Sequence, residues 1–343
     1  MMSQPSLRWG LMGASDIAET RMLPALRRTG HQVSAVLSAS LAHAQAYAQR
    51  NEIPVVLNDT DAFVSRTDID AVYISSTNDR HLDQARAAAA AGKHVLCEKP
   101  VALTLHEAAA ITDTCRAAGV ALAVNHHLPA AGTHRRIRQL VADGLVGRPL
   151  AVSVRHATLL PVRLRGWRLS DGPGAGAVMD LTCHDVSVVN PLLGTRAIET
   201  AAISARQGPW QAHSEDVSMA VIRYENDVLV QLHDSFTSAY TPTCLEVHGD
   251  AGSLRAVDVM KPEPDGTVTL TDARGTREIE VVDRRHTYDI TLDAFVAATT
   301  GSGRPIVTGE DAYNALSVTL AVLAAARTGS PAAVEFVPTP AGP

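Results

Sequence analysis

A lysine and an aspartate–histidine pair are the residues of this chain best suited to assist a redox reaction. Lys99 ends a short apolar run, where its ammonium group could donate to a substrate carbonyl oxygen and stabilise a developing alkoxide. Asp180 and His184 are four residues apart in an expected helix and therefore share one face. A histidine can exchange a proton near neutral pH, and reduction of a carbonyl needs a proton as well as a hydride.

Each of these features also has a plainer explanation. Lysines are common at strand ends, and an Asp–His pair with this spacing is often a structural hydrogen bond or half of a metal site. No third ligand is evident, so we expect no metal. Cys97 and Cys183, which lie close to these motifs, are expected to be small buried residues, because free cysteine packs as a hydrophobic group. Pro100, directly after Lys99, restricts the backbone and marks a candidate cis peptide bond.

A glycine-containing turn near the N-terminus has the pattern of a dinucleotide-binding site. Residues 10–18 align as Gly13-x-Ser15-x-x-Ala18 with the fingerprint G-x-G-x-x-G/A. Gly13 would permit the tight turn, Ala18 would let a helix pack closely, and helix amides would bind the pyrophosphate. Ser15 replaces the middle glycine, so we expect a looser backbone approach, compensated by its hydroxyl group as a donor.

The residues after the second expected strand bear on the choice between NAD and NADP. Val33–Leu37 is followed by Ser38, Ala39 and Ser40, where an NAD site usually carries Asp or Glu for the ribose hydroxyls. Without that carboxylate, a 2′-phosphate would meet no repulsion, which favours NADP(H). NAD(H) stays open as a cofactor, because the arginine expected beside a phosphate is replaced by His43. A solvated loop indifferent to the cofactor is the plainer alternative.

Short apolar runs alternate with helical stretches over residues 7–125. The apolar runs lie at 7–12, 33–38, 71–74, 94–97 and 120–124, and the helical stretches are Ile17–Arg28, Leu41–Arg50, His81–Ala91 and Leu105–Ala118. Strands separated by helices of this length imply parallel pairing with right-handed crossovers. We therefore predict an α/β protein whose residues 1–125 form a Rossmann domain, a doubly wound parallel sheet with ligands at the carboxyl ends of its strands.

Closely spaced strand signals after about residue 150 predict a different second domain. The strand-like segments are Val152–Leu160, Ile198–Arg206, Val217–Tyr224, Val228–Ser238, Cys244–Gly249, Ser253–Val257, Val268–Asp272 and Ile279–Val282. Helices are expected at Val178–Leu193, Thr287–Thr299 and Asp311–Thr328. We predict an α+β domain on a mostly antiparallel open sheet over residues 126–343, with a C-terminal helix that can pack back on the first domain. The Pro- and Gly-rich tail, residues 338–343, is expected to fray.

Composition narrows the range of partners. A chain of 343 residues is long enough for two domains, and its 46% hydrophobic and 19% charged content is typical of a globular enzyme. The net charge of −6 does not favour nucleic acid or an anionic membrane as a partner. No long apolar run or signal pattern is present, so the cytoplasm is expected. The protein is expected to be a monomer or a homo-oligomer assembled through the second-domain sheet.

The motifs Glu98-Lys99-Pro100 and Asp180-x-x-x-His184 resemble the two markers of the glucose–fructose oxidoreductase/inositol dehydrogenase/MocA family, and the resemblance covers essentially the whole chain. Further segments look like one branch of that family, the bacterial 1,5-anhydro-D-fructose reductases. These segments are residues 9–18, 76–81, 91–100, 125–128, 166–169 and 233–236. The resemblance implies a Rossmann fold, a nicotinamide cofactor and a small carbohydrate substrate.

The resemblance also implies roles for individual residues. Lys99 and His184 would be catalytic, with Asp180 orienting the histidine. The implied cofactor-binding residues are Gly13, Ala14, Ser15, Asp16, Ile17, Ser38, Ala39, His43, Ser76, Thr77, Asn78, His81, Glu98, Lys99, Asn125, Trp167, Arg168 and Tyr288. His43 stands where the reductase branch carries an arginine. Plainer roles stay open for three sites: Asn78 could cap a helix, Trp167 could be a core residue, and His126-His127 could be loop histidines.

The expected activity is NADPH-dependent reduction of a ketone on a cyclic sugar, from 1,5-anhydro-D-fructose to 1,5-anhydro-D-mannitol. Hydride transfer would be assisted by Lys99 and His184. One alternative is an NAD(P)-dependent inositol or aldose dehydrogenase of the same family. Another is a cofactor-binding sensor without turnover, which the presence of Lys99 and His184 argues against.

Overall fold

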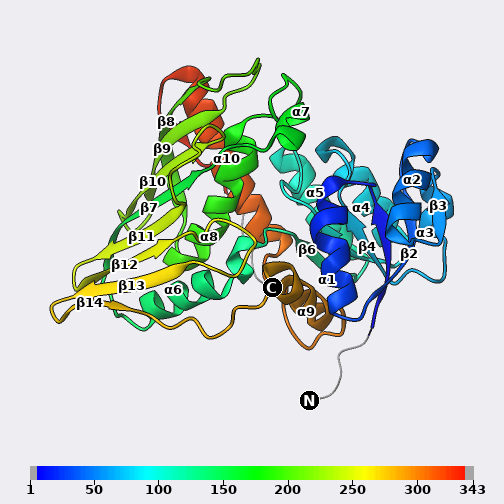
Figure 1. The fold of residues 1–343 in the computed structure, drawn as a ribbon, viewed down its shortest axis with the longest axis horizontal. Helices are drawn as coiled ribbons and strands as arrows, with labels where there is room; N and C mark the ends of the chain where they lie inside the picture. Colours follow the sequence, from blue (N-terminus) through cyan, green and yellow to red (C-terminus); the bar gives the residue numbers. More distant parts are fainter. Residues whose placement is uncertain (1–5, 337–343) are drawn as a thin grey trace. The chain divides into compact units, whose positions relative to one another are not determined.

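The computed structural model describes residues 6–336, which form two compact units (Figure 1). Within the described range, the first unit comprises residues 6–127 and 286–313, and the second comprises 128–285 and 314–336. The prediction had assigned everything after residue 125 to the second domain, whereas residues 286–313 belong to the first unit. The expectation about the tail at 338–343 lies outside the described residues.

The first unit is built on a six-stranded parallel sheet with strand order β3-β2-β1-β4-β5-β6, the order of a Rossmann fold. This confirms the predicted fold class. The strands are β1 (Arg8–Met12), β2 (Gln32–Leu37), β3 (Val55–Leu57), β4 (Ala71–Ile74), β5 (His94–Cys97) and β6 (Leu122–Val124). The sequence reading had not identified β3, a half-buried edge strand of three residues that is too short to show a hydrophobic pattern.

Helices connect these strands, and one further helix from late in the chain belongs to the same unit. They are α1 (Leu23–Arg28) after a π-helical turn η1 (Ala18–Met22), α2 (Leu41–Asn51), α3 (Thr60–Val64), α4 (His81–Ala90) after the 3₁₀ turn η2 (Asn78–Arg80), α5 (Leu105–Ala117) and α9 (Thr287–Thr299). α9 packs on α1, where Arg28 donates to Asp289 at 2.6 Å. The Phe295 ring lies 5.3 Å from the ring of Trp9 on β1. These contacts explain why residues so late in the chain complete the first unit.

The second unit contains a nine-stranded sheet with order β14-β13-β12-β11-β7-β10-β9-β8-β15. Its strands are β7 (Pro149–Ala157), β8 (Ala197–Ala205), β9 (Val217–Tyr224), β10 (Leu229–Ser235), β11 (Cys244–Gly249), β12 (Gly252–Val257), β13 (Thr267–Asp272), β14 (Gly275–Glu278) and β15 (Ala332–Ala333). Only β7 and β10 pair in parallel, so the sheet is mostly antiparallel as predicted. The strand predicted at 279–282 is wrong, because a tight turn pairs Gly275 with Asp272 and starts β14 earlier.

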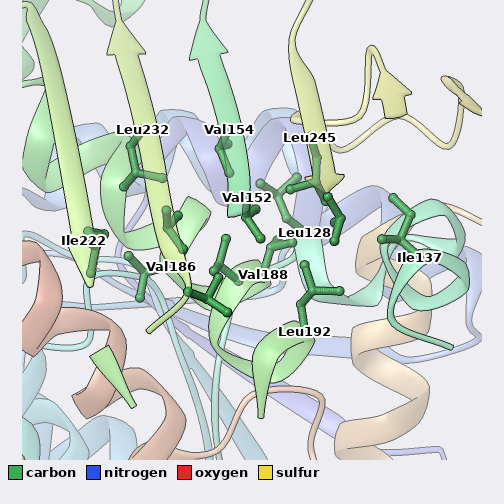
Figure 2. Close-up of a cluster of buried hydrophobic side chains, with 14 of the residues drawn as sticks. Leu128, Ile137, Val152, Val154, Val186, Val188, Leu192, Ile222, Leu232 and Leu245 are labelled. Carbon is green, nitrogen blue, oxygen red and sulfur yellow. The ribbon is translucent and has the colours of Figure 1, made fainter. Parts of the chain in front are cut away.

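The second unit also contains helical segments, the longest of which cover one face of the sheet (Figure 1). They are η3 (Leu128–Ala130), α6 (Gly132–Ala142), η4 (Val162–Leu164), α7 (Arg165–Arg168), the π-helical turn η5 (Val178–Thr182), α8 (Cys183–Leu193) and most of α10 (Gly309–Thr328). Figure 2 shows their core, in which Ile137 of α6 and Val186 of α8 join sheet residues such as Val154 and Leu232. Four arginine and histidine side chains obscure the apolar face of α6 in the sequence, and this helix had not been predicted. Within residues 6–336, no helix is long and apolar enough to cross a membrane.

Candidate active site

The turn after β1 has room for glycine only. Gly13 has φ = +121°, and a Cβ atom on it would lie 2.7 Å from the backbone nitrogen of Ser76 and 2.8 Å from the carbonyl carbon of Ser75. Any other residue would therefore push the turn away from the segment that follows β4. The close approach that a dinucleotide-binding turn requires is present at this position.

Ser15 ties this turn to its neighbours. Its hydroxyl donates to the Oγ atom of Ser75 at 2.8 Å and accepts from the backbone nitrogen of Ala18 at 3.2 Å. The hydroxyl hydrogen that we expected to compensate for the missing glycine is thus given to Ser75. The serine fixes the turn against the end of β4 and caps the start of the following helix.

The loop after β2 is held against the same turn. Ser40 caps α2 by accepting from the backbone nitrogen of His43 at 3.4 Å. The Nε2 atom of His43 lies 2.9 Å from the carbonyl oxygen of Ala14, and the Tyr47 hydroxyl donates to the carbonyl of Ser15 at 3.4 Å. His43 therefore joins the predicted adenosine end of the site to the predicted pyrophosphate end. No carboxylate occurs between residues 38 and 43.

A buried carboxyl group links the ends of three neighbouring strands. Glu98 follows β5 and accepts, through one carboxylate oxygen, from the hydroxyl of Tyr73 on β4 and from the Nδ2 atom of Asn125 after β6. Its second oxygen lies 3.3 Å from the backbone nitrogen of Lys99. Burial raises the pKa of Glu98 above its ordinary value. Glu98 was predicted to bind the cofactor; the structure shows that it also holds the backbone on which Lys99 stands.

The segments around Lys99 are fixed from both sides. The Lys99–Pro100 peptide is cis, which confirms the candidate seen in the sequence. His81 is buried, and its two ring nitrogens lie 3.2 Å from the carbonyl oxygen of Val101 and 3.3 Å from that of Ser76. His81 therefore joins the loops after β4 and β5, a positioning role that the prediction of direct cofactor contact had not included.

Other residues of the first unit that were predicted to bind the cofactor have contacts of their own. Ser76 donates through Oγ to Gln84 at 2.7 Å. The η2 turn starts at Asn78 with Thr77 in the capping position, so the alternative that Asn78 is a helix cap is wrong. The buried ring of Tyr288 stacks on that of His127, with 5.3 Å between the centroids.

His126 is a neighbour of Lys99 that sequence reasoning treated as an ordinary loop histidine. It is buried, and burial together with the positive charge of Lys99 lowers the pKa of His126 to about 3. The imidazole is therefore neutral at physiological pH. A neutral ring beside the ammonium adds no second positive charge to the position where Lys99 would meet a substrate oxygen.

In the second unit, Asp180 has a partner that the sequence did not reveal. Its carboxylate accepts from the Nε atom of Arg168 at 2.8 Å, and the Arg168 guanidinium lies 4.6 Å above the ring of Trp167. Trp167 is 47% exposed, so the alternative of a core tryptophan is wrong. These contacts bring three of the predicted residues together; the role of Asp180 in orienting His184 stays a prediction.

His184 is 6% exposed and lies on α8, with its ring 6.2 Å from that of His156 on β7. His156 in turn lies 2.8 Å, through Nδ1, from a carboxylate oxygen of the fully buried Asp185. Sequence reasoning assigned no role to His156, Asp185 or the nearby Asp234, although Asp234 lies in the segment 233–236 that resembles the reductase branch. The alternation along β10 places Asp234 on the same buried face as Leu232, a signal that could have drawn attention to it.

In the described part of the chain, no group of three or more His, Cys, Asp and Glu side chains is arranged to hold a metal ion.

Comparison with known proteins identifies the relatives of this arrangement. Residues 7–126 match the model of an oxidoreductase family with an NAD-binding Rossmann fold, and residues 134–255 match the GFO/IDH/MocA C-terminal domain. This chain belongs to the GFO/IDH/MocA family. It is therefore an oxidoreductase whose first unit is a nicotinamide-dinucleotide-binding domain.

Two relatives align with nearly the whole chain. A 1,5-anhydro-D-fructose reductase from Ensifer adhaerens is 43% identical over 96% of this chain and 98% of that protein. A D-xylose 1-dehydrogenase (NADP⁺) from Haloferax volcanii is 30% identical over 96% of this chain and all of that protein.

Solved structures share the fold at lower identity. An aldose–aldose oxidoreductase from Caulobacter crescentus, complexed with glycerol, has a TM-score of 0.86 at 21% identity and covers 96% of this chain and 100% of that chain. A levoglucosan dehydrogenase in complex with NADH and L-sorbose has a TM-score of 0.84 at 20% identity, with 97% and 100% covered. At these identities the likeness concerns the family fold alone.

Proposed function

We propose that this protein is an NADPH-dependent reductase of a ketone on a cyclic sugar, with 1,5-anhydro-D-fructose as substrate and 1,5-anhydro-D-mannitol as product. The observation that carries the proposal is the 43% identity, over 96% of the chain, to a 1,5-anhydro-D-fructose reductase. The presence of Lys99, Asp180 and His184 in this chain supports turnover and argues against a sensor without activity.

The residues present fit a dinucleotide cofactor, which when bound supplies the hydride. The turn at Gly13 leaves no space for a Cβ atom, and the Oδ1 atom of Asn125 is a buried acceptor with no donor among the described residues. A carboxamide group would satisfy that acceptor. Residues 13–17 would hold the pyrophosphate and Ser38, Ala39 and His43 the adenosine ribose.

The chain's own residues would assist in two ways. Lys99, positioned through Glu98, would donate to the carbonyl oxygen and stabilise the negative charge that develops there. His184 would deliver the proton that completes the alcohol. Asp180, paired with Arg168, would orient His184 or a substrate hydroxyl group.

We predict that NADPH is preferred over NADH, because the loop after β2 offers hydroxyl groups and no carboxylate. Ser38→Asp should lower kcat/KM for NADPH by roughly ten- to a hundredfold relative to NADH, since like-charge contacts cost several kcal/mol. Ser38→Asn, of the same size without the charge, is the matched control. Steady-state kinetics with both cofactors decide the matter, and a clear NADH preference of the wild-type protein would contradict the assignment.

A screen of sugars and keto-sugars tests the substrate class, with consumption of NADPH or NADH followed by absorbance. The 30% identity to an NADP⁺-dependent D-xylose dehydrogenase supports a second candidate, an aldose or inositol dehydrogenase. That alternative is identified by reduction of NADP⁺ or NAD⁺ with an aldose or inositol, without reduction of the keto-sugar by NADPH.

A further inference from the structure

Four polar side chains are buried together next to His184 in the second unit. His156 and Asp234 are register partners on the parallel strands β7 and β10, so both side chains lie on the face that α8 covers. Thr182 and Asp185 come from η5 and α8 above them. Asp185 is 0% and Asp234 2% exposed, so neither carboxyl group is solvated.

The hydrogen bonds of this cluster are incomplete in one place. His156 lies 2.8 Å through Nδ1 from Oδ1 of Asp185, and the Thr182 hydroxyl donates to Oδ2 of Asp234. The two remaining oxygens, Oδ2 of Asp185 and Oδ1 of Asp234, are buried without a donor among the described residues. The two carboxyl groups are also within hydrogen-bonding reach of each other.

Two ionised carboxylates cannot face each other at this depth without a large cost, because burial removes the bulk solvent that would screen their charges. A single proton resolves the deficit, since it lets one carboxyl oxygen donate to the other. We propose that Asp185 and Asp234 share one proton at neutral pH. We further infer that the one negative charge left on the pair holds the His156 ring and favours the protonated form of His184. This second inference rests on the proposed function.

Among the described residues, the other polar groups around Asp185 and Asp234 add little charge next to the pair. The groups around the pair are His156, whose Nδ1 lies 2.8 Å from Asp185, Thr182, which donates to Asp234, and Ser218 of β9, the register partner of Asp234. The ring of His184 lies 6.2 Å from that of His156, and His134 of α6 interacts electrostatically with His156. Burial lowers the pKa of His134 to about 4, so its ring is neutral. Burial raises the pKa of Asp185 to about 7, and burial with the charge of Asp185 raises the pKa of Asp234 well above its ordinary value.

The shared proton is tested without reference to activity, by urea unfolding of the wild-type protein and Asp234→Asn at several pH values. The amide keeps the size of the side chain and can donate to Asp185, but it cannot ionise. The folded wild-type protein would hold one proton that the unfolded chain releases above about pH 5. The equilibrium constant for unfolding, unfolded over folded, should therefore rise with pH in the wild-type protein. Divided by the same constant for Asp234→Asn, it should rise about tenfold per pH unit up to about pH 8. A flat ratio overturns the shared proton.

Infrared spectroscopy gives a second measurement in case Asp234→Asn does not fold. At about pH 8, the carbonyl stretch of an un-ionised carboxyl group should persist in the double variant Glu98→Gln/Glu215→Gln, which removes the two other carboxyl groups whose pKa burial raises. Absence of that stretch from the spectrum of the double variant overturns the shared proton.

The link to His184 is tested by the pH dependence of kcat for ketone reduction. Asp234→Asn leaves the charge on Asp185. The pH at which kcat falls should therefore be the same in this variant as in the wild-type protein. The double variant Asp185→Asn/Asp234→Asn removes the charge and should move that fall about one pH unit lower, because the protonated imidazole loses an attractive charge. An unmoved profile in the double variant contradicts the link. Failure of the proposed function would appear separately, as absence of ketone reduction by the wild-type protein.

Discussion

Lys99→Ala is expected to lower kcat by about 10²–10³-fold, the usual loss when one preorganised donor to a developing oxyanion is removed. NADPH affinity should change by only a few fold, because the turn at Gly13 and the loop after β2, which we propose to bind the cofactor, are untouched. Steady-state kinetics and fluorescence titration with NADPH measure the two quantities. The reason for the large effect is the position of Lys99, whose backbone nitrogen lies 3.3 Å from a carboxylate oxygen of the buried Glu98.

Lys93→Ala is the matched control for this variant. Lys93 precedes the same strand, but its Nζ atom donates to the carbonyl oxygens of Arg66 and Ile69. Its loss should reduce stability and leave kcat near the wild-type value. Turnover close to wild type in a correctly folded Lys99→Ala protein would show that the lysine is an ordinary strand-end residue.

His184→Ala is expected to lower kcat by about 10²–10⁴-fold, the contribution typical of a positioned proton donor. The fall of kcat with rising pH near neutrality should flatten, because the group that titrates there has been removed. The pH dependence of kcat for ketone reduction is the decisive measurement. His248→Ala, at an exposed position on β11, is the control and should leave both quantities unchanged.

A different outcome would assign the proton to Lys99. If His184→Ala raises KM and leaves kcat with its pH dependence intact, the histidine binds the sugar and donates no proton. Asp180→Ala distinguishes two roles of the aspartate: a mild loss indicates that it only orients the ring, and a severe loss indicates that it also binds substrate hydroxyls. The same variant would also deprive Arg168 of its carboxylate partner.

The sequence was sufficient to predict those elements whose residues form a local pattern. β4 and β5 are short runs of mostly buried residues, and both are found at the predicted positions. Gly13 has the positive φ and the close contacts that its place in the fingerprint implies. The mostly antiparallel second sheet followed from the short spacing between its strand signals.

The sequence was insufficient where the deciding contact joins distant residues. Glu98 is linked to Tyr73 and Asn125 across three strands, and neither spacing is a motif. Residues 286–313 join the first unit through contacts such as Arg28 with Asp289, which are 261 positions apart. Such pairings depend on which strands and helices become neighbours, so only the folded chain shows them.

The identity of the reduced compound tests the central proposal most directly. The purified protein should consume NADPH in the presence of 1,5-anhydro-D-fructose, and chromatography should identify the product as 1,5-anhydro-D-mannitol. NADH should support a lower kcat/KM with the same product. Binding of NADPH without reduction of this or any other keto-sugar, by either cofactor, would contradict the assignment as a sugar ketone reductase.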